Sequence, residues 1–438
     1  MHAATSKGFL PIAARLTRLA LPIAAGRLGV VGMGIVDTIV VGQFAPQELA
    51  HIGLGWAIPG PALLGGIALL IGVQLLAARA LGAGEPLRAG AIWWRGMVIA
   101  GVAGVAVVIV VALAAAPLLL LAGVAEDLAR PAARIGLLLA CSIPFHLAFV
   151  ASANFLEALQ RPGPAALAMW AANGVNLALN LLLVPHWGAE GSAMATILSR
   201  FSLALMLIGF IFHARALAPF RAARFAAAGS YSDLLAIGVA AFASSAAEAG
   251  AFAVLAVIAG RVGGVAVATF NIATGGLLTL VFMLALGFSS AGTVLASAEI
   301  GQGQAAQARR IGWTAIGLTL LAMAICGALS WTFAPLVARG FTADSAIVAS
   351  LVIVMPLVAA LMTPDGGQGV VDAMLRTRGE NWFPTWARVI PYATIAPPLS
   401  LYLGETLDLG ILGIFMALLL ASVVAFGVLL VRYSMPYE

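Results

Sequence analysis

The chain is poor in charge, since only 9% of its 438 residues are Asp, Glu, Lys or Arg, and Lys7 is the single lysine. Soluble domains carry about 25% charged residues, so this composition excludes a soluble protein. Hydrophobic residues make up 63% of the chain, and the mean hydropathy is +1.08. The apolar runs are about twenty residues long, which favours helices over the shorter strands of a membrane barrel. The sequence therefore predicts an all-α integral membrane protein.

Cysteine and enzyme motifs are also scarce. The two cysteines, Cys141 and Cys326, lie inside apolar runs and are expected to be small core residues rather than a disulfide or metal ligands. The sequence has no His/Cys cluster with metal-ligand spacing and no Walker-type phosphate loop. We therefore expect no enzyme activity, no metal and no organic cofactor. The net charge of +5 comes mostly from arginines near helix ends, so it does not indicate nucleic-acid binding.

Twelve spans are expected, each long enough to cross a bilayer. The expected spans are 18–43, 50–78, 94–121, 132–158, 163–185, 190–212, 233–259, 265–296, 311–337, 347–375, 383–403 and 410–431. Basic residues are enriched on the cytoplasmic side of membrane proteins. With the N-terminus inside, sixteen basic residues, Arg161, Arg376 and Arg388 among them, lie at inside ends and four lie outside. Both termini are therefore expected in the cytoplasm.

The chain repeats itself. Gly82-Ala83-Gly84-Glu85 matches Gly301-Gln302-Gly303-Gln304 at an offset of 219, and 157–161 matches 372–376 at an offset of 215. Six spans per repeat give both halves the same orientation, with a substrate path between them. We predict an N-lobe at 1–212, a cytoplasmic linker at 213–231 and a C-lobe at 232–438.

Four carboxylates lie inside the expected spans: Asp37, Glu248, Asp365 and Asp372. A carboxylate in a membrane is costly and usually marks an ion or substrate path. Asp37, Glu248 and Asp365 are therefore candidate cation- or proton-binding residues. Asp372 stands four residues before Arg376, as Glu157 does before Arg161, so a structural ion pair at the helix end is favoured for both acids.

Polar neighbours extend these candidates. Gln368 shares a helix face with Asp365. Asn176 and Asn180 share a face of the fifth span, and Thr196 follows on the sixth; they are candidate partners of Asp37, with ordinary interhelical hydrogen bonding as the alternative. Arg27 and Arg200 lie within spans and are expected either to neutralise buried acids, whose identity the sequence leaves open, or to extend their charged ends towards the membrane surface. Pro364, Gly366 and Gly367 predict a broken or kinked tenth helix.

The ordered set of motifs resembles the multidrug and toxic compound extrusion (MATE) family over nearly the whole chain. The strongest parts are 36–42 in the first span, 77–84 after the second, 260–263 before the eighth, and Asp365 with Gln368 and Arg376 in the tenth. The resemblance implies two six-helix lobes, an N-lobe proton or cation site at Asp37, and a C-lobe cation site at Glu248 and Asp365. These three acids together resemble the NorM-like branch. The chain departs from that family at Leu361, where an aromatic hydroxyl is often found one turn before Asp365, and at Ala285, where proline is usual.

We therefore expect a monomeric secondary antiporter of the bacterial cytoplasmic membrane, in contact with membrane lipids. It would export organic, in particular cationic, small molecules in exchange for Na⁺ or H⁺. Two alternatives stay open: a flippase for lipid-linked oligosaccharides of the same superfamily, and a membrane-embedded enzyme or receptor. The acidic character of the charges within the spans argues against the first, and the lack of catalytic clusters argues against the second.

Overall fold

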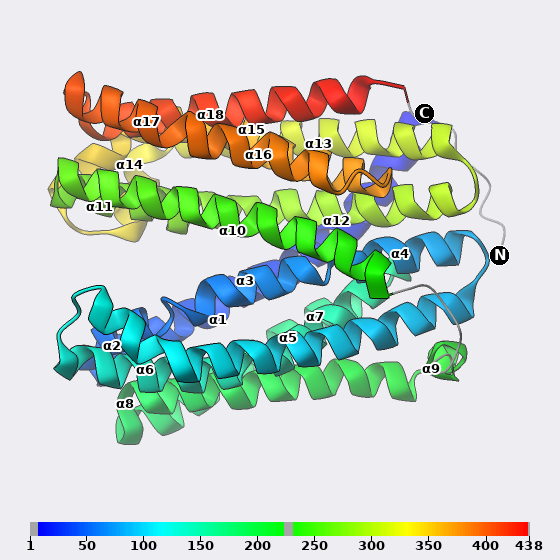
Figure 1. Cartoon of the computed structure of the whole chain (residues 1–438), viewed down its shortest axis with the longest axis horizontal. Helices are drawn as coiled ribbons and strands as arrows, with labels where there is room; N and C mark the ends of the chain where they lie inside the picture. Colours follow the sequence, from blue (N-terminus) through cyan, green and yellow to red (C-terminus); the bar gives the residue numbers. More distant parts are fainter. Residues whose placement is uncertain (1–7, 223–230, 437–438) are drawn as a thin grey trace. The chain divides into compact units, whose positions relative to one another are not determined.

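The computed structural model describes residues 8–222 and 231–436, which are almost wholly helical and contain no β-strand (Figure 1). These residues form two compact units. The N unit comprises 25–242 and 301–303, and the C unit comprises 8–24, 243–300 and 304–436. The first turns of α1, with Leu16 and Ala20, are part of a core cluster of the C unit. The lobes and linker expected from sequence stay a prediction, and 223–230 of that linker lie outside the described residues.

Nine α-helices begin in the described residues before position 223. They are α1 (Phe9–Phe44), α2 (Leu49–Gly55), α3 (Pro59–Leu69), α4 (Ile71–Gly82), α5 (Pro86–Leu121), α6 (Glu126–Cys141), α7 (Ile143–Ala158), α8 (Gly163–His213) and α9 (Ala218–Ala222). A short 3₁₀ turn at Pro46–Glu48 joins α1 to α2, and another at Arg215–Leu217 joins α8 to α9.

The helices after the linker are α10 (Tyr231–Val262), α11 (Gly264–Asn271), α12 (Thr279–Gly301), α13 (Ala305–Thr332), α14 (Ala334–Phe341), α15 (Ser345–Thr377), α16 (Trp382–Thr394), α17 (Ala396–Leu401) and α18 (Gly410–Ser434). Two π-helical turns, Ile272–Leu278 and Tyr402–Thr406, continue α11 and α17. At the start of α15, the Asp344 carboxylate accepts hydrogen bonds from the backbone N–H groups of Ala346 and Ile347 and so caps the helix.

The expected twelve-span architecture is confirmed. Within the described residues, ten helical stretches are long and apolar enough to cross a membrane. One of them, α8, carries both the fifth and the sixth expected spans, because Gly188 (φ 52°, ψ −135°) interrupts its helical backbone. The eleventh expected span, 383–403, falls on α16, α17 and the π turn, where Pro391 lies inside α16 and the helix ends at Thr394. The tenth span does not break, since α15 runs from Ser345 to Thr377 with Pro356 and Pro364 inside it.

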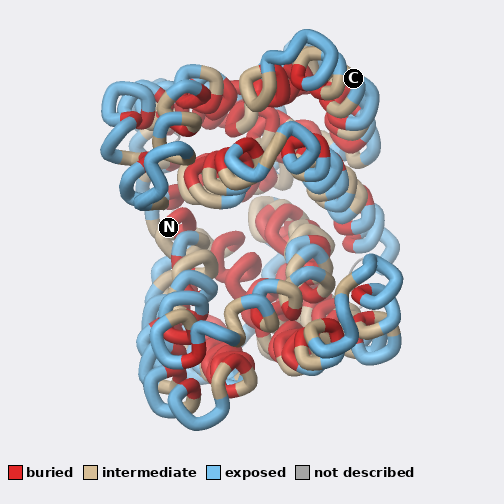
Figure 2. Tube along the Cα trace, turned by 90° about the vertical axis from the view of Figure 1, so that its left-hand side faces the viewer, coloured by how far each residue is buried: buried red, intermediate tan, exposed pale blue. Residues whose placement is uncertain are grey.

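Large apolar side chains cover the outside of the helices. Leu113, Leu121 and Val257 are exposed by 73%, 84% and 67%. In Figure 2, buried stretches lie on the inner sides of the helices and exposed stretches on their outer sides. This distribution is the one that contact with lipid requires, because the hydrocarbon of a bilayer favours apolar surface and the helices satisfy their own backbone groups.

Small residues let the helices of each unit approach closely. Helix α13 packs along α15, and a Cβ atom placed on Gly327 of α13 would lie 2.7 Å from the carbonyl oxygen of Ala359 on α15. A Cβ atom on Gly317 of the same helix would meet nothing within 4 Å. These two glycines therefore separate the effect of packing from the effect of helix propensity.

We predict that Gly327→Ala lowers the free energy of unfolding by about 1–3 kcal/mol, because the added methyl group overpacks a backbone contact. Gly317→Ala is the matched control and should be neutral or stabilising by up to about 1 kcal/mol, since alanine favours the helix. Thermal unfolding of both purified variants in detergent measures the difference. Equal melting temperatures for the two variants would contradict this packing.

Candidate functional site

The Asp37 carboxylate of α1 is buried in the N unit and accepts three hydrogen bonds from α8. Its Oδ1 atom accepts from Nδ2 of Asn176 at 3.0 Å and from Nδ2 of Asn180 at 2.8 Å, and its Oδ2 atom accepts from Oγ1 of Thr196 at 2.8 Å. Asp37 is 2% exposed, and its three partners are fully buried. The three partners that the sequence suggested therefore do converge on this acid.

The fold of α8 makes this convergence possible. Asn180 and Thr196 stand on either side of the non-helical Gly188, so the two stretches of α8 fold back on each other. The positive φ of Gly188 is strained for residues with a side chain. The Glu48 carboxylate accepts a hydrogen bond from the backbone N–H of Ala189 at 2.7 Å, which satisfies a donor at the start of the second stretch.

The side-chain carbonyl oxygens of the two asparagines beside Asp37 accept no hydrogen bond from the described residues. The Oδ1 atoms of Asn176 and Asn180 are buried and have no hydrogen-bond partner. Asn173, which lies on the same stretch of α8, is not part of the site, because its amide donates to the backbone carbonyl of Gly29 at 2.9 Å. A carboxylate, two free amide oxygens and a hydroxyl are oxygen ligands that suit a hard monovalent or divalent cation.

The structure also supplies partners for the two arginines within the N-half spans. The Arg200 guanidinium is buried, donates to Oγ of Ser142 at 2.9 Å, lies over the ring of Trp56 and attracts the charge of Asp37. The Arg27 guanidinium lies 3.8 Å from Oε1 of Glu157. The sequence-based expectation that these arginines neutralise buried acids therefore agrees with their positions.

The expected pairing of Glu157 with Arg161 is wrong. Helix α7 ends at Ala158, and Gln160 adopts a positive φ of 58°, so Arg161 does not continue the helix. Residues four apart in the sequence face each other only where both lie in the same helix. Glu157 instead accepts a hydrogen bond from Nε2 of Gln74 at 2.6 Å. By contrast, α15 continues to Thr377, and the expected pair of Asp372 and Arg376 is present at 2.9 Å.

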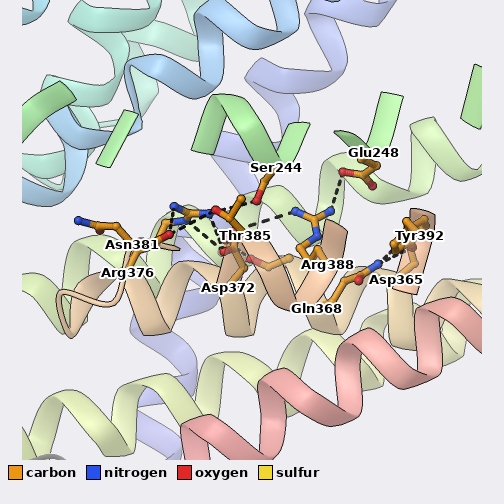
Figure 3. Close-up of polar contacts among 12 residues, drawn as sticks. Ser244, Glu248, Asp365, Gln368, Asp372, Arg376, Asn381, Thr385, Arg388 and Tyr392 are labelled. Atoms are coloured by element: carbon orange, nitrogen blue, oxygen red, sulfur yellow. Dashed lines mark hydrogen bonds and ion pairs between the residues drawn. The ribbon is translucent and has the colours of Figure 1, made fainter. Parts of the chain in front are cut away.

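In the C unit, polar side chains from α10, α15 and α16 form one acidic cluster (Figure 3). Asp365 Oδ1 accepts from Nε2 of Gln368 at 2.8 Å and from the hydroxyl of Tyr392 at 3.3 Å. The Gln368 amide also donates to the Tyr392 oxygen at 2.8 Å. Tyr392 of α16 thus brings an aromatic hydroxyl to Asp365, although Leu361 stands one turn before Asp365 on α15.

Two arginines join the other acids of this cluster. Arg388 of α16 contacts Glu248 of α10 at 2.6 Å and Asp372 of α15 at 3.9 Å. Arg376 donates to Asp372, to Ser244 of α10 and to Thr385 of α16. Within these five charged side chains, three carboxyl groups face two guanidinium groups. With all three carboxyl groups ionised, the cluster carries one negative charge in excess.

Sequence reasoning missed Arg388 and Tyr392. Arg388 was counted among the arginines at inside helix ends, yet its side chain is 9% exposed and ion-paired with an acid inside a span. A signal was present, because Arg388 and Tyr392 are four residues apart in an apolar stretch and share a helix face. The partner of Arg388 lies 140 residues away, and that pairing cannot be read from spacing.

Comparison with known proteins identifies similar chains. The profile of the MatE family matches residues 22–182 and 240–401. The chain is 36% identical over 430 residues to the "Probable multidrug resistance protein NorM" of Caulobacter vibrioides, covering 96% of this chain and 91% of that protein. It is 24% identical to the "Multidrug resistance protein MdtK" of Yersinia pseudotuberculosis, covering 89% of this chain and 87% of that protein.

Two solved structures have the same fold. One is described as a "eukaryotic MATE transporter AtDTX14" and has a TM-score of 0.87, 16% identity, and coverage of 98% of this chain and 97% of that chain. The other is described as the "outward-facing conformation of a multidrug resistance MATE family transporter" and has a TM-score of 0.87, 21% identity and 99% coverage of both chains.

We predict that Arg388→Gln lowers the free energy of unfolding by about 2–3 kcal/mol, because it leaves the Glu248 charge without its guanidinium. The double variant Arg388→Gln/Glu248→Gln should recover most of that loss. Thermal unfolding in detergent measures both variants. Arg130→Gln is the control, since it breaks the exposed pair with Glu126 and should cost less than about 1 kcal/mol. Additive losses in the double variant would contradict the coupling.

Proposed function

The chain belongs to the MatE family, and from that premise we propose that it is a secondary antiporter that exports organic, in particular cationic, compounds in exchange for H⁺ or Na⁺. The names of the related proteins support multidrug export. They give no support to the alternative of an oligosaccharide flippase.

The observation that carries the proposal is the Asp37 site. The carboxylate is buried, and the three side chains around it can each serve both of its protonation states, because amides and hydroxyls carry donors as well as acceptors. The free Oδ1 atoms of Asn176 and Asn180 would accept a hydrogen bond from a protonated Asp37 or contribute ligands to Na⁺. The site is therefore suited to bind and release one positive charge.

The proposed coupling of ion binding to transport rests on the hydrogen bonds by which Asp37 joins α1 to α8. In its ionised form, it joins α1 to both stretches of α8 through charge-assisted hydrogen bonds, which are about twice as strong as neutral ones. A bound proton or cation changes the strength and direction of those bonds. Occupancy of Asp37 therefore biases how α1 packs on α8, which is the two-state element that ion-driven transport requires.

The acidic cluster of the C unit is the proposed binding region for the cationic substrate or the coupling cation. Arg388 already forms an ion pair with Glu248. Within the described residues, the hydrogen-bond donors that reach Asp365 are the Gln368 amide and the Tyr392 hydroxyl. We propose that Glu248 and Asp365 share an added cation and that Arg388 and Asp372 adjust to it. The excess of one carboxyl group in the cluster favours this binding electrostatically.

The remaining assignments are proposals that rest on sequence and on the relatives. The bacterial origin of the related NorM and MdtK proteins supports a location in a bacterial cytoplasmic membrane. The excess of arginine on one side supports cytoplasmic termini. The apolar outer faces of the helices support direct contact with lipids, and a monomer stays the proposal made from the sequence.

We predict that Asp37→Asn folds and inserts but slows coupled efflux at least about tenfold across the whole pH range, a change of about 1.4 kcal/mol in the barrier. Asparagine imitates the neutral carboxyl and cannot release a charge. Efflux from proteoliposomes against external pH, for wild type and variant, measures the effect. Asp127→Asn is the matched control, because Asp127 is exposed and far along the chain from the site. A variant profile that overlays the wild type would refute the coupling role of Asp37.

We predict that Glu248→Gln and Asp365→Asn each weaken ion-driven efflux and the binding of a fluorescent organic cation by about tenfold or more. Each change removes one negative charge and leaves the cluster without its excess carboxyl group. Equilibrium binding to the purified variants and efflux at matched protein amounts are the measurements. Unchanged binding and efflux in both variants would exclude the cluster as the cation site.

A further inference from the structure

Glu157 is a buried carboxyl group that neither the Asp37 site nor the acidic cluster includes. It lies in the last turn of α7, is 4% exposed, and accepts a hydrogen bond from Nε2 of Gln74 of α4 at 2.6 Å. Gln74 is 1% exposed. A buried carboxyl group of this kind is costly unless it is paired or neutralised, so its environment determines which form it takes.

Glu157 lies farther from its nearest guanidinium group than Glu248 and Asp372 do from theirs. Its nearest guanidinium group, that of Arg27, is 3.8 Å from Oε1, and the same Nη2 atom donates to Oδ1 of Asn154 at 3.4 Å. In the C unit, the corresponding distances are 2.6 Å for Glu248 and 2.9 Å for Asp372. Glu157 is therefore less firmly committed to the ionised form by its geometry than the acids that arginines contact directly.

The amide of Gln74 suits a carboxyl group that changes its protonation state. A carboxylate only accepts hydrogen bonds, whereas a carboxylic acid also donates one. An amide carries both NH₂ donors and a carbonyl acceptor, and a rotation of the amide exchanges them. Gln74 can therefore offer Glu157 a donor or an acceptor, which a lysine or arginine partner could not do.

We propose that Glu157 is a second proton-binding site of the N unit, in addition to Asp37. The carboxylate takes up one proton from water to become a carboxylic acid and gives the same proton back, so no other reactant is needed. The inference rests on the proposed ion-driven antiport and adds to it a second carboxyl group that changes charge.

The two acids of the N unit have different arginines beside them, Arg200 for Asp37 and Arg27 for Glu157. Arg27, which contacts Glu157, precedes Asp37 by ten residues on α1, or about 15 Å along the helix. His146 of α7 lies within electrostatic reach of both Arg27 and Arg200, and both of its ring nitrogens are buried without a hydrogen-bond partner.

The charges facing Glu157 are few. Within the described part of the chain, Arg27 of α1 is the charged side chain that acts on it, and α4 contributes the Gln74 amide. Asn154 of α7 accepts from Arg27 and donates to the backbone carbonyl of Leu70. On the neighbouring α5, Arg88 pairs with Glu85, and Arg95 lies over the ring of Tyr231. Asp37 and Glu157 are thus balanced by Arg200 and Arg27. Protonation of either acid leaves one positive charge in excess and opposes the entry of a cation.

Infrared difference spectra of the purified full-length protein between about pH 6 and pH 8 test the proposal, because exposed carboxyl groups stay ionised in that range. Only acids that bind a proton there contribute the stretch of a protonated carboxyl group. Glu157→Gln should lose one carboxyl's share of this signal, in the wild-type background and in Asp37→Asn alike. Glu85→Gln, an exposed glutamate, is the matched control and should overlay the wild type.

The variants also separate the inference from the function on which it rests. If Glu157→Gln overlays the wild type while Asp37→Asn loses signal, Glu157 is a static polar contact and the second site is refuted, but Asp37 keeps its role. If Asp37→Asn overlays the wild type, Asp37 binds no proton in this range, and the proton-driven form of the proposed antiport fails instead.

A conservative variant covers the case in which Glu157→Gln does not fold. Glu157→Asp retains a carboxyl group beside Gln74 and should give a signal of the same size at a shifted frequency. Gln74→Leu leaves Glu157 in place, removes its amide partner, and should move the midpoint of the Glu157 signal. A spectrum of Gln74→Leu with an unmoved midpoint would overturn the proposal.

Discussion

The cost of a buried charge is the constraint on which the polar architecture of this chain depends. A carboxylate surrounded by apolar helices is tolerated only when donors or guanidinium groups replace the water it has lost. Asp37 obtains three side-chain donors, and Glu248 and Asp372 obtain arginines. The partners of Asp37 and Glu248 stand on other helices, so these two acids also fix the packing of their units, whereas Arg376 lies one turn from Asp372 on the same helix. Whatever changes the charge of the acid must therefore change the packing as well.

The two units differ in the balance between carboxyl groups and guanidinium groups. In the N unit, Asp37 and Glu157 face the guanidinium groups of Arg200 and Arg27, and in the acidic cluster of the C unit three acids face two arginines. Addition of a cation neutralises the cluster of the C unit. In the N unit, a proton on Asp37 or Glu157 leaves an arginine uncompensated, and the resulting positive charge opposes a cation nearby. The proposed antiport is consistent with this difference, because protons and organic cations would then be favoured by different residues.

Much of this arrangement could be predicted from the sequence, and the part that could not has a physical reason. Polar side chains within apolar runs are costly, so Asp37, Asn176, Asn180 and Thr196 stood out, and the structure brings them together. Arg388 did not, because it lies in the second turn of the eleventh span, where it was counted among the arginines of the inside helix ends. Its contact with Glu248 and the approach of Tyr392 to Asp365 depend on how α16 is turned against α10 and α15.

The error over Glu157 shows how the repeat is built. Helix α7 ends at Ala158 and α15 ends at Thr377, an offset of 219 that agrees with the glycine motifs and disagrees with the offset of 215 between the acidic motifs. At the structural offset, Glu157 corresponds to Arg376. Each of these residues reaches the first helix of its own half, Glu157 through Arg27 of α1 and Arg376 through Ser244 of α10. Both halves therefore retain a contact between their fourth and first helices. The residue that makes it on the fourth helix is acidic in the first half and basic in the second. Because helix ends fix which residues are equivalent, a duplicated frame can keep its packing and still carry opposite charges at the same position.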